Sequence, residues 1–283
     1  MSRTELGDRA RVLIDQALSA GGRTVVVTGA GVSAESGIPT FRGPEGYWTV
    51  GSKHFRPEDL ATQRAFRDMP WEVWSWYLFR RGVCRKASPN AGHQALVELE
   101  ELLQDRFVLI TQNVDGIHLR AGNSLDRTYQ IHGNIDFMRC ADECTDDLYR
   151  VPELISIDWP KDRRVDDAER SLLVCPSCGG RARPHVLWFD EAYDEVHFRF
   201  DSSIRAAGRA DLVIIAGTSG ATSLPVHVAE IAAQRGVVML AVNLEESPFT
   251  ELAERLPKGA ALFGQSGSIL PEITSWFRTH LGA

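Results

Sequence analysis

The chain has 283 residues and a net charge of −7, a size that suits one large domain or one domain with a smaller appendage. The acidic balance argues against nucleic acid as a partner, because phosphate binding requires a basic face. No apolar run reaches the ~18 residues needed to span a membrane, and the N-terminus lacks a signal-peptide core. We therefore expect a cytoplasmic globular protein that binds no membrane; nothing indicates its oligomeric state.

Apolar periodicity and turn residues predict helices and strands that alternate along the chain. Residues 4–20 have the apolar spacing of a helix, and the β-branched run 24–28 is typical of a buried parallel strand. A tryptophan-rich helical stretch covers 57–86, and Ser88-Pro89 is expected to cap the next helix. Further strands are predicted at 107–112, 129–132, 211–218 and 237–243, and further helices at 225–234 and 269–280. This alternation indicates an α/β fold, a Rossmann-type parallel sheet with helices on both faces.

A glycine-rich loop follows the first predicted strand, where Gly29 to Ala34 fits the pattern G-x-G-x-x-A. Glycines at these positions allow the tight turn and the close backbone approach that a pyrophosphate requires. The motif alone is weak, because an ordinary strand-to-helix turn produces the same pattern.

Several motifs follow this loop in a fixed order. The loop itself continues as GAGVSAESGIPTFRGPEGYW (29–48), and TQNVDGIH, HGN, two cysteine pairs, PHVLWF, GTS and NLE come after it. Over about residues 20 to 275 the chain resembles the sirtuins, the NAD-dependent protein deacylases. The resemblance implies NAD as cofactor, acyl-lysine proteins as substrates, and nicotinamide, free lysine and an O-acyl-ADP-ribose as products.

The resemblance also implies which residues bind NAD. The glycine loop would close over the cofactor, with Ala30, Phe41 and Arg42 shaping the nicotinamide-ribose and phosphate pocket. Later motifs would hold the pyrophosphate and the adenosine ribose, although the GTS motif alone is also typical of an ordinary turn. The expected cofactor-binding set is Gly29, Ala30, Gly31, Ser33, Phe41, Arg42, Gln112, Asn113, Val114, Asp115, Gly217, Ser219, Asn243, Glu245 and Ser266.

Polar residues follow the ends of two predicted strands, at the edge where a parallel sheet binds ligands. Loss of nicotinamide leaves a cationic ribose centre that the acyl-lysine amide oxygen can capture. A neutral imidazole can then take a ribose hydroxyl proton near neutral pH, and the resemblance assigns this base to His132. By the same resemblance Asn113 orients the ribose and a water, Asp115 holds the nicotinamide carboxamide, and Gln112 contacts the ribose.

Two other functions compete with this interpretation. A hydride-transferring dehydrogenase explains the glycine loop, but it explains neither the cysteine pairs nor the Asn-x-Asp and histidine set. A non-catalytic sensor of NAD or ADP-ribose needs no catalytic residues, whereas this chain keeps His132, Asn113 and Asp115. The cysteine pairs and the presence of His132, Asn113 and Asp115 favour an enzyme that transfers the acyl group.

Two cysteine pairs predict a metal site. Cys175 and Cys178 form a C-x2-C knuckle followed by two glycines, and Cys140 and Cys144 are spaced C-x3-C. Four thiolates form a closed tetrahedral site, which is structural and not catalytic. We therefore expect one structural zinc, and we expect the unpaired Cys84 to be a packed helix residue.

The helical stretch carries Tyr77 and Arg80, which match the Tyr-x-x-Arg pair of the sirtuins that favour succinyl- and malonyl-lysine. At spacing i, i+3 they lie on one helix face, where a phenol and a guanidinium can together bind a carboxylate. The alternative is a surface arginine in a plain deacetylase. The resemblance of PHVLWF to the strand that pairs with substrate implies that the Leu187 carbonyl accepts the lysine N–H. Asp190 replaces the usual glycine, and its carboxylate can favour basic residues beside the acyl-lysine.

These expectations together give two structural parts, with NAD and acyl-lysine meeting in the cleft between them. The Rossmann-type NAD-binding domain is expected to comprise 1–43, 88–136 and 205–283. The smaller lobe is expected to comprise a helical module, 44–87, and a zinc-binding module, 137–204.

Overall fold

The structure is a computed structural model that describes residues 6–40 and 57–282. Two residues of the expected cofactor-binding set, Phe41 and Arg42, lie outside the described residues. Within the described ranges no helix is long and apolar enough to cross a membrane.

A six-stranded parallel sheet forms the centre of the larger part, with the order β3-β2-β1-β7-β8-β9. The strands are β1 (Thr24–Thr28), β2 (Phe107–Thr111), β3 (Thr128–Gln130), β7 (Leu212–Ala216), β8 (Val238–Asn243) and β9 (Gly259–Phe263). The chain leaves β1 toward β2 and β3 and later returns on its other side to β7. This is the strand order of a doubly wound sheet, and its topological switch point lies between β1 and β7.

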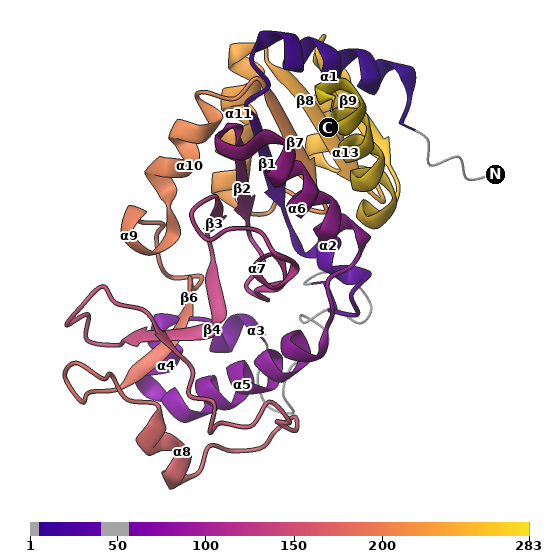
Figure 1. Ribbon diagram of the computed structural model, residues 1–283. Coiled ribbons are helices and arrows are strands. Elements are labelled where there is room, and N and C mark those ends of the chain that lie inside the picture. Colours follow the sequence, from indigo (N-terminus) through magenta and orange to yellow (C-terminus); the bar gives the residue numbers. More distant parts are fainter. Residues whose placement is uncertain (1–5, 41–56, 283) are drawn as a thin grey trace.

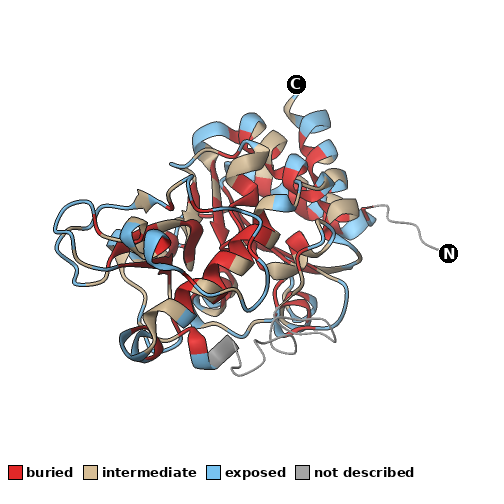
Figure 2. Ribbon diagram, turned by 90° about the horizontal axis from the view of Figure 1, so that it is seen from below, coloured by how far each residue is buried: buried red, intermediate tan, exposed pale blue. Residues whose placement is uncertain are grey.

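Helices cover both faces of this sheet, as expected (Figure 1). One face packs against α1 (Asp8–Ala20), α6 (Ala91–Leu103) and α13 (Ser266–Leu281). The other packs against α10 (Phe200–Ala207), α11 (Ser223–Arg235) and α12 (Pro248–Arg255). Every residue of β1 and β7 is buried, which explains why both sequences are continuous apolar or β-branched runs (Figure 2).

The smaller lobe lies beyond the carboxyl ends of β1 and β2 (Figure 1). Its antiparallel sheet has the order β5-β4-β6 and is formed by β4 (Gly133–Cys140), β5 (Tyr149–Arg150) and β6 (Ala182–Val186). Its helices are α3 (Pro57–Leu60), α4 (Gln63–Asp68), α5 (Pro70–Lys86) and α8 (Asp167–Leu172). These elements share one core that is rich in tryptophan, including Trp74, Trp76, Trp159 and Trp188.

Shorter elements complete the described part of the chain. They are α2 (Ala30–Ala34), η1 (Gln104–Arg106), α7 (Ile117–Ala121) and α9 (Glu195–Phe198). Of these, α2 follows the glycine loop and α7 follows the polar loop after β2, so both border the switch point.

Some predicted boundaries were wrong for identifiable reasons. The stretch 57–86 is three helices, because the Thr62 side chain caps α4 and Pro70 begins α5. Ser88-Pro89 does not cap the next helix; the Asn90 side chain does, accepting from the backbone of Gly92 and His93. Between the two cysteine pairs lie β5 and α8, which none of the predicted helices and strands covers.

Candidate active site

Three glycines let two loops meet at the topological switch point. Gly29 N–H donates to the Ala216 carbonyl over 3.0 Å, and Gly31 N–H donates to the Gly217 carbonyl over 2.8 Å. Gly217 has a φ of +61°, and a Cβ on it would lie 2.5 Å from the Val32 nitrogen. Because these glycines have no side chain, the backbones of the two loops can touch. The contact lies at the place where such a sheet binds a dinucleotide.

Three of the expected site residues form one buried polar cluster beside this contact. Ser33 Oγ donates to Asp115 Oδ2 over 2.7 Å, and the Asn113 amide donates to Ser33 Oγ over 3.2 Å. The same amide donates to the Gly29 carbonyl over 3.0 Å. Burial raises the pKa of Asp115, while hydrogen bonds from Ile117 and Ser33 and then nearby arginine charges act in the opposite direction. The carboxylate is thus held rigidly at the inner wall of the site.

Gln112 links the loop after β2 to the loop after β7. Its amide donates to Thr218 Oγ1 over 2.9 Å, and its carbonyl oxygen accepts from Thr222 Oγ1 over 2.9 Å. Thr222 is the N-cap position of α11 but makes no side-chain capping bond, because its hydroxyl is turned toward Gln112. The first N–H groups of α11 are consequently left for another acceptor, which suits a pyrophosphate.

The remaining expected cofactor residues lie around the same edge of the sheet. Asn243 ends β8 and donates to the Thr218 carbonyl over 3.2 Å, which joins the loops after β7 and β8. Ser219 and Glu245 are exposed there. Ala30 begins α2, Val114 is buried, and Ser266 is buried at the start of α13. Hydroxyl, amide and carboxylate groups of this kind fit the ribose hydroxyls of NAD.

His132 lies in the turn between β3 and β4, with both ring nitrogens engaged. Nδ1 lies 3.0 Å from the Gln112 carbonyl oxygen, and Nε2 lies 2.8 Å from the Tyr193 hydroxyl. Burial lowers the pKa of His132 to about 4, against the opposite effect of the Gln112 carbonyl. The imidazole is therefore neutral near pH 7, as a base must be. No local pattern singled out Tyr193, which follows the PHVLWF motif on a segment without periodicity.

Tyr77 and Arg80 are both buried on α5, at 1% and 3% exposure, so the competing interpretation of Arg80 as a surface arginine is wrong. Trp188 Nε1 donates to the Tyr77 hydroxyl over 2.9 Å. The Arg80 guanidinium lies 4.7 Å from the Trp76 ring centroid and 5.7 Å from that of Tyr77. Burial raises the pKa of Tyr77 to about 12, and the charge of Arg80 acts in the opposite direction.

The segment 187–189 continues β6 toward His132. Val186 is paired with Gly133, and Leu187 N–H donates to the His132 carbonyl over 3.0 Å. Phe189 N–H donates to the Ala61 carbonyl over 3.0 Å. Among the described residues no donor bonds the Leu187 carbonyl, which leaves it available for a substrate N–H.

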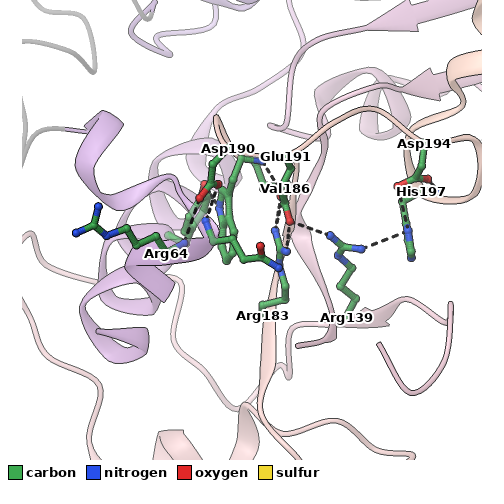
Figure 3. Close-up of polar contacts among 11 residues, drawn as sticks. Arg64, Arg139, Arg183, Val186, Asp190, Glu191, Asp194 and His197 are labelled. Atoms are coloured by element: carbon green, nitrogen blue, oxygen red, sulfur yellow. Dashed lines mark hydrogen bonds and ion pairs between the residues drawn. The ribbon is translucent and has the colours of Figure 1, made fainter. Parts of the chain in front are cut away.

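Buried charges anchor this segment (Figure 3). Glu191 accepts from Arg183 and, over 2.9 Å, from the Trp188 backbone N–H. Arg183 also donates to the Val186 carbonyl over 3.0 Å and lies over the Trp188 ring. Asp190 accepts from the backbone N–H groups of Gln63 and Arg64, over 2.7 and 3.2 Å, at the first turn of α4. The segment is thereby tied to both modules of the smaller lobe.

The four cysteines converge at the far end of the smaller lobe. Their sulfur atoms all lie within 4.8 Å of one another, with 3.7 Å between Cys140 and Cys178 and 3.6 Å between Cys144 and Cys175. A tetrahedral zinc with Zn–S bonds of about 2.3 Å requires sulfur separations of about 3.8 Å. The set fits one structural zinc. Cys84, as expected, is packed inside α5.

Comparisons with known proteins agree with this geometry. Residues 29–223 match the Sir2 family. An NAD-dependent protein deacylase of Leptospira interrogans is 42% identical over 248 residues, which are 87% of this chain and 89% of the relative. A Sir2 homologue in complex with NAD has a TM-score of 0.76 at 33% identity, over 99% of this chain and 98% of that one. A Sir2 protein with a deacetylated p53 peptide and 3′-O-acetyl-ADP-ribose has a TM-score of 0.70 at 26% identity, over 95% and 97% of the chains. This chain therefore belongs to the Sir2 family, the sirtuins.

Proposed function

We propose that this chain is an NAD-dependent protein-lysine deacylase that prefers succinyl- and malonyl-lysine over acetyl-lysine. The deacylase activity is supported by the family and by the arrangement of the site. The acyl preference is supported by one observation, the buried guanidinium of Arg80 beside the Tyr77 phenol.

The residues around the switch point would each have a defined task. The loops after β1, β7 and β8 would hold the two riboses and the pyrophosphate of NAD, which supplies an electrophilic ribose carbon when nicotinamide departs. Asp115 and Asn113 would hold the nicotinamide end, because their side chains are fixed through Ser33. His132 would accept a ribose hydroxyl proton at Nε2, while its Nδ1 stays bonded to the Gln112 carbonyl.

The acyl group would lie between α5 and the Asp115 cluster. Arg80 acts electrostatically on Tyr77, Cys84 and Asp115, so its charge reaches from the helix core to the nicotinamide side of the site. The Tyr77 oxygen accepts from Trp188, which leaves its own hydrogen free to donate. A carboxylate is the ligand that accepts from a phenol and a guanidinium together.

The peptide backbone would pair with the segment 187–189, where the Leu187 carbonyl would accept an N–H of the acyl-lysine. Asp190 caps α4 and remains exposed, so it would present negative charge beside this segment. A preference for basic residues next to the acyl-lysine stays a prediction, as does the cytoplasmic location.

A panel of acetyl-, malonyl-, succinyl- and long-chain acyl-lysine peptides, each incubated with NAD and analysed by mass, tests the proposal. We expect nicotinamide release with every accepted peptide and the largest kcat/KM for the succinyl peptide. A larger kcat/KM for acetyl-lysine would identify a plain deacetylase and remove the acyl preference. Binding of NAD without nicotinamide release from any peptide would identify a sensor and remove the enzymatic function.

A further inference from the structure

The Tyr193 hydroxyl occupies the basic nitrogen of His132. Tyr193 lies between β6 and α9, and its oxygen is 2.8 Å from His132 Nε2. The two rings are stacked at an angle of 27° with centroids 5.8 Å apart, and Tyr193 also stacks on Phe200 with centroids 6.1 Å apart. The Thr222 hydroxyl, which donates to the Gln112 side chain over 2.9 Å, also acts to lower the pKa of Tyr193, so Tyr193 borders the loop that carries the cofactor-site contacts of Gln112.

The neighbours of the imidazole determine its tautomer. The Gln112 carbonyl can only accept, so Nδ1 must carry the ring hydrogen in the neutral form. Nε2 then has one lone pair, and the Tyr193 O–H is the donor to it. A ribose hydroxyl that donates its proton to Nε2 needs the same lone pair, so both hydroxyls cannot be bound there at once.

We propose that Tyr193 is a positioning residue that holds His132 in its base-competent neutral tautomer in the free protein and yields Nε2 to a ribose hydroxyl when NAD binds. This inference rests on the proposed function in one respect, the role of His132 as base. Tyr193 keeps its proton throughout: its hydrogen bond to Nε2 breaks and the ribose hydroxyl replaces it. In the reaction the ribose O–H bond breaks, the proton passes to Nε2, and the electron pair remains on the ribose oxygen.

Two features of the surroundings indicate that the ribose hydroxyl replaces the Tyr193 hydroxyl as the donor to Nε2. They argue against a relay in which the proton passes through the tyrosine. Burial raises the pKa of Tyr193 to about 12, against the effect of the Thr222 hydrogen bond, so the phenol resists losing its proton. Burial lowers the pKa of His132 and the Gln112 carbonyl opposes this effect, with no charged side chain of the described residues contributing. Among the described residues, the polar groups hydrogen-bonded to the imidazole are the Gln112 carbonyl after β2 and the Tyr193 phenol before α9.

The test is Tyr193→Phe, which keeps the ring between His132 and Phe200 and removes only the hydroxyl. A bond donated to Nε2 stabilises the neutral imidazole, so its loss should raise the pKa of His132 in the cofactor-free protein. The expected shift is about 0.5–1 unit upward, measured by NMR titration of the imidazole. The acid limb of kcat/KM for NAD should move the same way, because it reports the free enzyme. The kcat at saturating NAD and its pH profile should stay within about twofold of wild type, because Tyr193 has left Nε2 by then.

Tyr149→Phe is the matched control, since it removes a phenol that is hydrogen-bonded to Ser177 over 2.7 Å in the smaller lobe, away from His132. It should change neither the NMR titration nor either pH profile. An unshifted His132 in Tyr193→Phe, or imidazole ¹⁵N shifts showing the proton on Nε2 in wild type, would overturn the proposal. A fall of kcat by about 10²–10⁴-fold would also overturn it, because that loss marks a relay in the proton transfer itself. The NMR titration needs no turnover, so failure of the deacylase function is detected separately, by absent nicotinamide release in wild type.

Discussion

The two parts of this molecule are stabilised by different chemistry. The large domain, meaning the six-stranded sheet and its covering helices, has two cores that are almost purely aliphatic. The small lobe, meaning β4–β6 with α3–α5 and α8, has a tryptophan-rich core. Within the described ranges, all four buried arginines lie in the small lobe: Arg80, Arg81, Arg139 and Arg183.

This difference follows from size. A six-stranded sheet covered on both faces buries enough apolar surface to need no buried arginine. The small lobe has a sheet of only three strands, and it uses guanidinium groups that stack on tryptophan and pair with Asp136 and Glu191. Buried ion pairs of this kind add little net stability but fix one geometry. The large domain is therefore stabilised mainly by apolar burial, and the small lobe by charges that fix the geometry of the segment 187–189 and of the proposed acyl pocket.

Removal of zinc should give the largest effect and should be confined to the small lobe. Structural zinc contributes on the order of 10–16 kcal/mol of apparent binding energy that is coupled to folding. The wild type should contain about one zinc per chain. Cys175→Ala, or chelation of the wild type, should lower the zinc content, the melting temperature and the activity. Hydrogen exchange should show lost protection in β4 and β6 while β1 and β7 remain protected. A metal-free protein with full activity and unchanged stability would contradict the zinc site.

Replacement of His132, which lies at the boundary between the two parts, should lower the reaction rate and leave the stability of the fold unchanged. Removal of a general base typically costs about 10²–10⁴-fold in rate. His132→Ala should lose deacylation to that extent, whereas its melting temperature and its affinity for NAD, measured by calorimetry, should change little. Near-normal turnover of the variant would remove the assigned role.

Neutralising Asp136 tests whether the charges of the small lobe are mutually dependent. Asp136 accepts from Arg81 over 3.1 Å and from Arg85 over 2.7 Å, and both Asp136 and Arg81 are buried. Asp136→Asn leaves Arg81 uncompensated and should lower the free energy of unfolding by about 3–5 kcal/mol. Denaturant unfolding measures the loss. Glu251→Gln is the control, because it breaks an exposed pair with Arg255 in the large domain and should cost at most about 1 kcal/mol. Equal effects in both variants would contradict the contrast between the two parts.

Removing the Arg80 charge should give the smallest and most selective effect. One hydrogen bond to a charged group contributes roughly 1.5–3 kcal/mol before the carboxylate's desolvation is subtracted. Arg80→Met should therefore lower kcat/KM for succinyl peptide by about 10–100-fold, mainly through KM, and leave acetyl peptide unaffected or slightly improved. Arg85→Met, on the same helix but half-exposed and paired with Asp136, should not change the ratio. A parallel loss for both peptides would show that Arg80 only supports the core.

Much of the large domain could be predicted because its signals are local. The strand β1 has the bounds that its β-branched run indicates, and the predicted strands at 107–112 and 211–218 differ from β2 and β7 by at most two residues at either end. The clustering of Asn113 and Asp115 follows from strand ends that share one sheet edge. β9 was missed, because its sequence GAALF has neither alternation nor β-branched residues.

The small lobe was harder to predict because its contacts join distant segments. β4 and β6 are separated by the zinc loop, and their pairing has no counterpart in local sequence. Tyr193 meets His132 across 61 positions, and Trp188 meets Tyr77 across 111. Spacing supplied the cysteine set and resemblance supplied the Tyr-x-x-Arg pair, but neither supplied the groups that hold them in place.

The hydrogen bond from Leu187 to the His132 carbonyl has a mechanical consequence. The segment proposed to bind the peptide and the imidazole proposed as the base share one short stretch of backbone, since β4 begins directly after His132 and pairs with the end of β6. Gly133, at a φ of +83°, packs so closely on His185 that a Cβ at this position would lie 2.2 Å from the carbonyl oxygen, so only glycine fits the turn. A peptide that docks on 187–189 would therefore stiffen the backbone that carries the imidazole. A change that weakens peptide binding would then also make the position of the imidazole less precise.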